Sequence, residues 1–149
     1  MKLSIMKNGN LLVTCDKKLI EYTSTGIQVR EIVLQKSITR LQHAIQLDND
    51  QFVVCHTSNE LDRVCIVDKK RQIIKSYGRD SGSQEGQMDM PSYLALDPSG
   101  CILVADHNNH RIIKLNSDCK FISEFIPSSF GLYKPTRIKY EKEKLYITD

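Results

Sequence analysis

Apolar and polar residues alternate in short runs along the whole chain, and these runs recur in a fixed order. One apolar run of about six residues comes back four times, at residues 10–15, 51–56, 101–106 and 144–149. The last positions of these runs are 41, 50 and 43 residues apart. A period of roughly 40–50 residues is typical of repeat architectures, in which each copy is one supersecondary unit.

A shorter apolar alternation precedes each of these runs. It is formed by the pairs Leu3/Ile5, Ile45/Leu47, Leu94/Leu96 and Ile138/Tyr140. Apolar positions with a period of two predict a strand with one face turned toward the core and one turned away. The sequence therefore predicts two successive strands at the start of each copy.

Two further strands complete the unit. A third strand begins at a basic residue in each copy, namely Lys18, Arg63 and Arg111. A fourth follows a polar hairpin, at residues 27–32, 72–77 and 121–125.

The predicted turns between the first two strands contain residues that accept tight-turn geometry. They are Asn8-Gly9, Asp48-Asn49-Asp50 and Asp97-Pro98-Ser99-Gly100, and the charged segment Glu141-Lys142-Glu143 is the poorest match. No long segment has helical periodicity, so the fold class is all-β.

A four-stranded unit cannot bury both of its own faces and has to stack against further copies. The copies predict an incomplete β-propeller of about three and a half antiparallel blades. We place the blade units at approximately residues 1–34, 41–78 and 91–126, with an incomplete unit at 135–149. A closed propeller usually needs four to eight blades, and the chain looks like a fragment of a longer protein.

The third copy, Pro91 to Phe125, carries a recognisable motif. It contains a glycine turn, the strand end Val104-Ala105-Asp106 and the run Asn109-His110-Arg111-Ile112. This pattern resembles an NHL repeat, and NHL propellers resemble six-bladed rings. The first two copies depart from it, with Cys15 and His56 in place of the aspartate.

The closest resemblance is to the C-terminal propellers of tripartite-motif proteins. It implies a non-catalytic module that recruits a protein or RNA partner within a larger ubiquitin ligase or RNA regulator. Ligase activity would reside in RING domains, which this chain does not contain, so the chain is not expected to be an enzyme. A cytoplasmic location is expected from the cysteines, which are interpreted as reduced thiols.

Composition narrows the function classes only slightly. The chain has 40% hydrophobic and 26% charged residues and a formal net charge of +3, values that are ordinary for a globular protein. It lacks an apolar run of about 18 residues, so no membrane partner is expected. The five cysteines show no metal-binding spacing and are interpreted as buried, reduced thiols. No cofactor, metal or small-molecule substrate is expected.

Asp106 and Arg111 flank the short loop between the second and third strands of the third copy. Such a pair can meet as a bidentate, partly shielded ion pair. Because equivalent positions recur in each copy, we interpret the pair as a structural loop clamp rather than a ligand site.

An enzymatic alternative remains, in which a metal at the ring centre serves a lyase or hydrolase. His107 and His110 have no geometric reason to converge on a loop, unlike histidines four residues apart on a helix. This alternative requires side chains such as His56, Asp106 and Asp149 to project into one channel.

The side of the propeller that carries the second-to-third-strand loops and the links between blades is the candidate partner surface. Its cations, hydrogen-bonding residues and one aromatic suit an acidic peptide or a phosphate backbone. The candidates are Lys36, Arg40, Arg63, His107, Asn109, Tyr133, Lys134 and Arg137. Acidic residues lie on the same side, so a solvated face of mixed charge remains the alternative.

Overall fold

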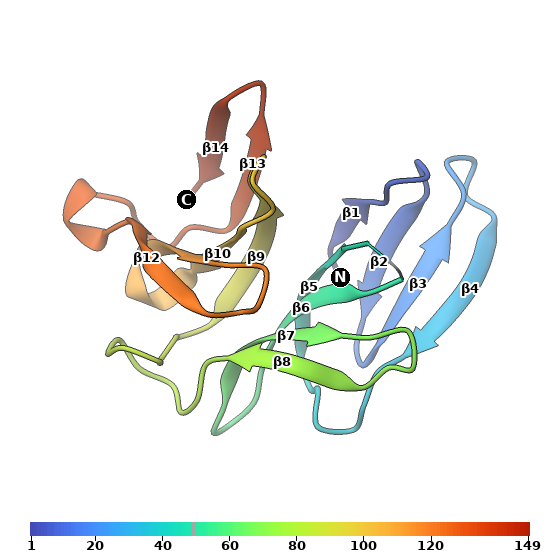
Figure 1. Ribbon diagram of the computed structural model, residues 1–149, viewed down its shortest axis with the longest axis horizontal. Coiled ribbons are helices and arrows are strands. Elements are labelled where there is room, and N and C mark those ends of the chain that lie inside the picture. The colour runs from blue at the N-terminus through green and yellow to red at the C-terminus, as the bar shows by residue number, and fades with distance from the viewer. Residues whose placement is uncertain (49) are drawn as a thin grey trace.

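The chain folds entirely into short antiparallel sheets that follow one another in sequence (Figure 1). The computed structural model describes residues 1–48 and 50–149. Within these residues, three sheets have four strands and the last has two. The predicted turn residue Asn49 lies outside the described residues. The all-β, incomplete-propeller prediction is confirmed.

Each sheet is one blade, with its strands hydrogen-bonded in chain order. The first blade contains β1 (Leu3–Ile5), β2 (Leu11–Cys15), β3 (Lys18–Tyr22) and β4 (Gln28–Val33). The second contains β5 (Leu41–Gln46), β6 (Phe52–Thr57), β7 (Asp62–Val67) and β8 (Ile73–Tyr77). The third contains β9 (Pro91–Leu96), β10 (Ile102–Asp106), β11 (Arg111–Leu115) and β12 (Phe121–Ile126). The fourth has β13 (Arg137–Glu141) and β14 (Lys144–Thr148), and two short 3-10 helices, His107–Asn109 and Ser128–Phe130, lie in the loops.

The four blades are arranged around a common centre in chain order (Figure 1). The first strands of neighbouring blades contact one another, β1 with β5, β5 with β9 and β9 with β13. The first strand of each blade is therefore the innermost one, as in a propeller.

The apolar core lies between the blades and forms three clusters, one at each junction. The first cluster joins Leu12 and Ile32 of the first blade to Phe52 and Val54 of the second. The second joins the second blade to the third, and the third joins the third blade to the fourth. Stacking of successive blades thus supplies the burial that a single sheet cannot achieve.

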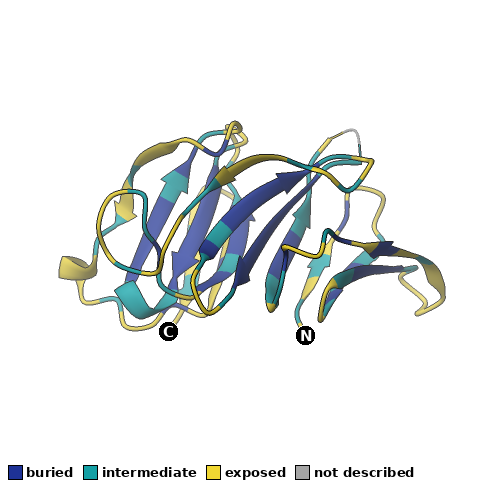
Figure 2. Ribbon diagram, turned by 90° about the horizontal axis from the view of Figure 1, so that it is seen from below, coloured by how far each residue is buried: buried dark blue, intermediate teal, exposed yellow. Residues whose placement is uncertain are grey.

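The second and third strands of the middle blades are buried on both faces, unlike the pattern of one face in and one face out that was predicted for the first strands. In β6, Phe52 and Val54 face the first blade, whereas Val53 and Cys55 face the third. Every residue of β6 is buried as a result. In β2, by contrast, only Leu12 and Thr14 are buried, so alternation survives in the first blade, where one face has no neighbouring blade (Figure 2).

The predicted alternation in the first strand of the second blade is wrong by one residue. Ala44, not Ile45, lies in the register position of Leu3 and Leu94, and Leu47 lies beyond the end of β5. A shift by one residue moves a side chain to the opposite face. Accordingly Ala44 packs toward the first blade and Ile45 toward the third. Because alanine has a small side chain, the apolar pattern did not mark Ala44 as the core-facing position of β5.

The connections divide between two faces of the structure. The hairpins that join first to second and third to fourth strands form the hairpin face. The loops from second to third strands, together with the links between blades, form the linker face, and both chain ends lie on this side (Figure 2). The hairpin turns follow the predicted chemistry, since Gly9, Gly26 and Gly100 have φ values of +82°, +87° and +81°, which glycine adopts without steric cost.

Truncation of a side chain at a blade junction should lower the free energy of unfolding more than truncation of a side chain at the surface. Phe52 is 0% exposed in the first junction, whereas Phe130 is 77% exposed. We expect Phe52→Ala to lower the free energy of unfolding by about 3–5 kcal/mol, because it removes packing and leaves a cavity. Phe130→Ala should change it by less than about 0.5 kcal/mol. Urea titration followed by circular dichroism measures both, and equal effects would contradict a core located between the blades.

Candidate functional site

The third blade contains a buried ion pair at the end of β10. Arg111 Nε lies 2.8 Å from Asp106 Oδ2, and the Asp106 side chain is 0% exposed. The two residues face each other in the β10–β11 register. A single N–O contact forms rather than the bidentate pair expected from the sequence, because the other guanidinium nitrogens have different partners.

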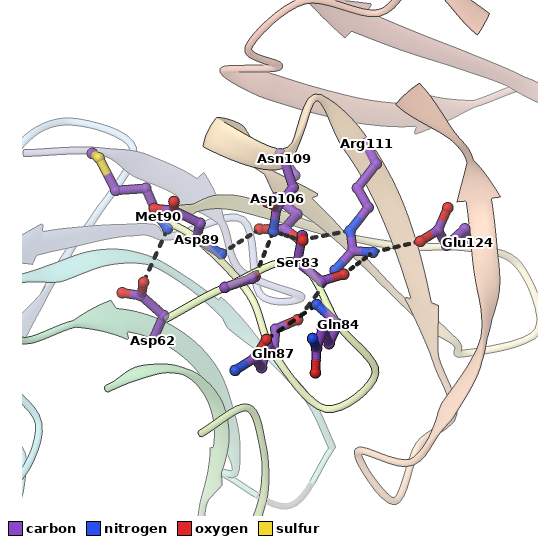
Figure 3. A network of polar contacts seen from close by, with 12 residues as sticks. Asp62, Ser83, Gln84, Gln87, Asp89, Met90, Asp106, Asn109, Arg111 and Glu124 are labelled. Carbon is purple, nitrogen blue, oxygen red and sulfur yellow. Dashed lines mark hydrogen bonds and ion pairs between the residues drawn. The ribbon is translucent and has the colours of Figure 1, made fainter. Parts of the chain in front are cut away.

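Those other nitrogens hold the loop that links the second blade to the third. Arg111 Nη1 donates to the Ser83 carbonyl at 3.2 Å, and Nη2 donates to the Gln87 carbonyl at 3.1 Å. Nη1 also pairs with Glu124 on β12 (Figure 3). One guanidinium therefore ties together the β10–β11 turn, the outer strand and residues 78–90, which we call the connector.

Asparagines of the same turn add further bonds to the connector. Asn109 Nδ2 donates to the Gly82 carbonyl and to Asp106 Oδ2, both at 2.8 Å. Asn108 Nδ2 donates to Asp89 Oδ1 at 2.8 Å. The Asp89 amide donates to Asp106 Oδ1 at 2.8 Å (Figure 3). The polar residues of the motif thus bind their own protein, and both contacts of the Asn109 side chain are made by its Nδ2.

Burial raises the pKa of Asp106 above its ordinary value. The hydrogen bonds from Asn109 and the Asp89 amide, together with the Arg111 cation, act in the opposite direction. A desolvated carboxylate is stable only with such a complete set of partners.

The equivalent positions in the earlier blades have the same register but different chemistry. His56 faces Arg63 across the β6–β7 pair, and Cys15 faces Lys18 across the β2–β3 pair. His56 Nε2 lies 3.7 Å from the Cys65 sulfur instead of forming an ion pair. Arg63 Nε donates to the Gly78 carbonyl at 3.4 Å. The clamp is therefore specific to the third blade.

The remaining predicted partner residues fall into separate groups on the linker face. Lys36 and Arg40 are exposed in the link between the first two blades. Tyr133 stacks on His110, with ring centroids 5.0 Å apart, and the Lys134 ammonium lies 5.8 Å from the Tyr133 ring centroid. The link between the third and fourth blades thus presents an aromatic and a cation on this face.

A third group lies at the centre, where His107 and Arg137 line one hollow. His107 Nδ1 is 3.2 Å from the Pro135 carbonyl oxygen. The sequence analysis named these two residues but not the side chains that accompany them.

One residue from each blade lies at the same register position at this centre. These residues pair with equivalent positions of the second strands, namely Thr14, Cys55, Ala105 and Thr148. The four pairing partners are Lys2, His43, Tyr93 and Arg137. We call these four partners the central quartet. Lys2 belongs to it because its backbone continues the β1–β2 ladder, with the Thr14 amide donating to the Lys2 carbonyl at 2.9 Å.

Members of the central quartet contact one another across the blades. The rings of His43 and Tyr93 stack with centroids 3.7 Å apart and planes inclined by 17°. The Lys2 ammonium lies 5.7 Å from the Tyr93 ring centroid and donates to the Ser92 carbonyl. These contacts join the inner strands of the first three blades at one point.

Two hollows share Lys2 and Arg137. The larger, of about 430 Å³, is also lined by Met1, Leu3, Val13 and Tyr93. The smaller, of about 320 Å³, is also lined by Gln42, Met90, Ser92, His107 and Thr136. No acidic side chain of the described residues lines either one.

The buried His43 is an unusual member of this centre. Its Nδ1 accepts a hydrogen bond from the Leu94 amide at 3.2 Å, so the proton of the neutral ring resides on Nε2. Nε2 has no hydrogen-bond partner among the described residues, and the Leu3 backbone has a small effect that raises the pKa of the ring. Burial, followed by the nearby Lys2 charge, lowers the pKa of His43 to about 3.

Among the described residues, no group of three or more histidine, cysteine, aspartate or glutamate side chains could hold a metal ion. In the described part of the chain, no helix has the length and apolar character needed to cross a membrane.

Comparison with known proteins agrees with this architecture. Residues 88–115, which span the motif turn, match the NHL repeat. No curated protein is significantly similar to the chain in sequence. The chain therefore has a β-propeller-type fold that carries an NHL repeat.

Solved structures share the fold at low sequence identity. A streptogramin B lyase matches with a TM-score of 0.71 and 15% identity, over 99% of this chain and 47% of its own. Virginiamycin B lyase from Staphylococcus aureus matches with a TM-score of 0.63 and 16% identity, over 98% and 47%. A protein of unknown function from Bacteroides caccae matches with a TM-score of 0.59 and 14% identity, over 94% and 48%. The chain spans about half the length of these proteins.

Loss of the charge on Asp106 should destabilise the third blade strongly. Asp106→Asn keeps the side-chain shape but leaves Arg111 as a buried cation with a weaker partner set. We expect a loss of about 3–5 kcal/mol in the free energy of unfolding. The matched control is Glu31→Gln, which removes the exposed pair with Lys18 and should cost no more than about 1 kcal/mol. Chemical denaturation tests this, and similar losses in both variants would contradict a clamp role.

Stability should fall as the solution is acidified, because His43 stays neutral in the fold. Its pKa of about 3 lies below the value of about 6.5 in an unfolded chain. The unfolded state therefore binds more protons below neutrality, and stability is lost as the pH falls from about 7 toward 3. We expect His43 to contribute a loss of about 2 kcal/mol between pH 7 and pH 5.

His43→Asn tests this contribution, because the asparagine oxygen can accept the Leu94 amide without titrating. Urea midpoints at pH 7 and pH 5 should differ less in the variant than in the wild type. Part of the pH dependence should remain, since burial also lowers the pKa of His56 to about 4. An unchanged pH dependence in the variant would contradict a neutral, buried His43.

Proposed function

We propose that the chain is a non-catalytic binding module that recognises a protein or RNA partner on its linker face, within a larger tripartite-motif-like protein. The observation that carries the proposal is the central hollow, where two cations meet with no acidic side chain among the described lining residues. Cationic clefts without internal counterions raise the local concentration of negatively charged ligands.

Both faces carry cations outside the ion pairs, and those of the linker face are available to a partner. On the hairpin face, Lys7, Arg30, Lys75 and Lys114 pair with carboxylates of neighbouring turns. Among the described residues, several linker-face cations have no such partner, namely Lys2, Lys36, Arg40, Lys134 and Arg137. A partner's negative groups can therefore approach these cations without displacing an internal carboxylate.

The enzymatic alternative is favoured by one observation, the similarity of the fold to streptogramin B and virginiamycin B lyases. At these identities, similarity of fold does not carry chemistry with it. The residues that the alternative requires at the centre have other contacts. His56 contacts Cys65, Asp106 binds the connector, and Asp149 accepts a hydrogen bond from the Tyr133 amide at 3.2 Å. These contacts support the binding proposal.

The test compares two variants with the same loss of charge on opposite faces. The linker-face variant carries Lys36→Ser, Arg40→Ser and Lys134→Ser. The hairpin-face variant carries Lys69→Ser, Lys70→Ser and Lys120→Ser, at positions that are also exposed. Fluorescence anisotropy measures binding of a glutamate-rich peptide and of a single-stranded RNA at two salt concentrations.

We expect the linker-face variant to lose at least about tenfold in affinity for the preferred probe, and the hairpin-face variant to stay within about twofold. Binding should weaken with salt, since screening reduces contacts between exposed charges. Equal loss in both variants, or no binding of either probe, would overturn the proposal. Cleavage of virginiamycin B by the wild-type chain would instead support the lyase alternative.

A further inference from the structure

The central hollow has the features of a site for one carboxylate rather than a diffuse basic surface. Lys2 and Arg137 come from the first and the fourth blade and line both hollows together. Burial lowers the pKa of Lys2, Cys55 acts in the opposite direction, and the nearby Arg137 charge lowers that pKa by a smaller amount. Two like charges brought together at a partly buried point favour a bound anion between them.

We propose that this hollow receives an aspartate or glutamate side chain from an extended acidic peptide of the partner, with the carboxylate between Lys2 and Arg137. The inference rests on the proposed function and names the partner chemistry at its centre. The carboxylate accepts hydrogen bonds from the Lys2 ammonium and the Arg137 guanidinium, and the peptide's neighbouring apolar side chain enters the larger hollow.

Hydrogen-bond capacity is available on both cations. The Lys2 ammonium has three donors and uses one for the Ser92 carbonyl. The Arg137 guanidinium has five donors in a planar fork, and none is paired within the described part of the chain. An arginine fork matches the two oxygens of a carboxylate, and such charge-assisted bonds are among the strongest polar contacts.

Lys2 is held in place before any ligand binds. Its backbone amide donates to Thr14 Oγ1 at 2.9 Å, and its carbonyl accepts from the Thr14 amide at 2.9 Å. Its ammonium is fixed between the Ser92 carbonyl and the Tyr93 ring. A preorganised cation loses less conformational entropy on binding than a mobile surface lysine does.

The walls of the hollows favour a peptide over RNA. The larger hollow has an apolar side formed by Leu3 and Val13, which suits an aliphatic side chain next to the acidic one. The Tyr93 ring is the aromatic surface that a nucleobase would need for stacking. His43 already covers one face of it, and the Lys2 ammonium lies over the ring. Gln42 lines the smaller hollow. Its Nε2 donates to the Arg40 carbonyl at 3.2 Å, and its Oε1 can accept a hydrogen bond from the peptide backbone.

The experiment uses blocked peptide pairs that differ only in charge at one position. One peptide has the sequence Gly-Leu-Glu-Val-Gly and its counterpart has glutamine in place of glutamate. Isothermal titration measures both against the wild-type chain, Lys2→Met and Arg137→Gln. Lys70→Met on the hairpin face is the matched control, since it removes the same charge from an exposed site.

We expect each hollow variant to weaken binding of the glutamate peptide by about tenfold, which corresponds to about 1.4 kcal/mol. The glutamine peptide should bind the wild type about as weakly as the glutamate peptide binds the variants, and the variants should not weaken it further. Lys70→Met should leave both peptides within about twofold. Lys2→Arg, which keeps the charge, should retain most of the affinity, and circular dichroism should show that every variant is folded.

Other results would overturn the inference in distinguishable ways. Equal binding of the two peptides, or full binding by Lys2→Met and Arg137→Gln, would remove the carboxylate site and leave the linker-face proposal standing. A larger loss of single-stranded RNA binding than of peptide binding in these variants would assign the hollow to phosphate. Absence of binding by both peptides and by RNA would end the proposed function as well.

Discussion

The buried pair between Asp106 and Arg111 is the contact on which the arrangement of the middle blades depends. The connector is a long link without a strand of its own, and ordering it costs conformational entropy. Arg111 and the Asp106 loop fix this segment through its carbonyls and amides. Met88, fully buried in the second junction, can then pack between the second and third blades. Gly78 reinforces the fit, since a Cβ there would lie 2.2 Å from the Asp62 carbonyl oxygen.

A buried ion pair is weak evidence for added stability, because desolvation of two charges offsets their attraction. Its role here is geometric. A carboxylate with three partners and a guanidinium with four acceptors permit one arrangement of turn, connector and outer strand. Where the same register position holds His56, the link from the first blade to the second is shorter. No comparable segment has to be fixed there, which explains why the motif is not needed in that blade.

Much of the fold follows from the sequence because strand order and turn chemistry are local properties. The Asp106–Arg111 contact was predictable for the same reason, since a tight turn brings its two ends together. The sequence could not reveal that Arg111 also holds Ser83 and Gln87, because those contacts use backbone carbonyls far along the chain. Nor did it reveal the central quartet. Lys2 and Tyr93 meet only through the curvature of the blades, and the misplaced register at Ala44 hid the position of His43.

When the repeats are aligned with the correct register, these four residues occupy one equivalent position, which we call the central column. The residue types in this column differ from those at the neighbouring positions. Positions beside it hold apolar residues in each blade, for example Leu3, Ala44 and Leu94, because every blade has the same packing requirement. The central column instead holds lysine, histidine, tyrosine and arginine. Its side chains meet at the centre, where no stacking constraint demands a common residue type. A repeat protein can vary such a column without disturbing its junctions. Under the proposed function, partners are therefore distinguished by this column rather than by the motif that identifies the fold.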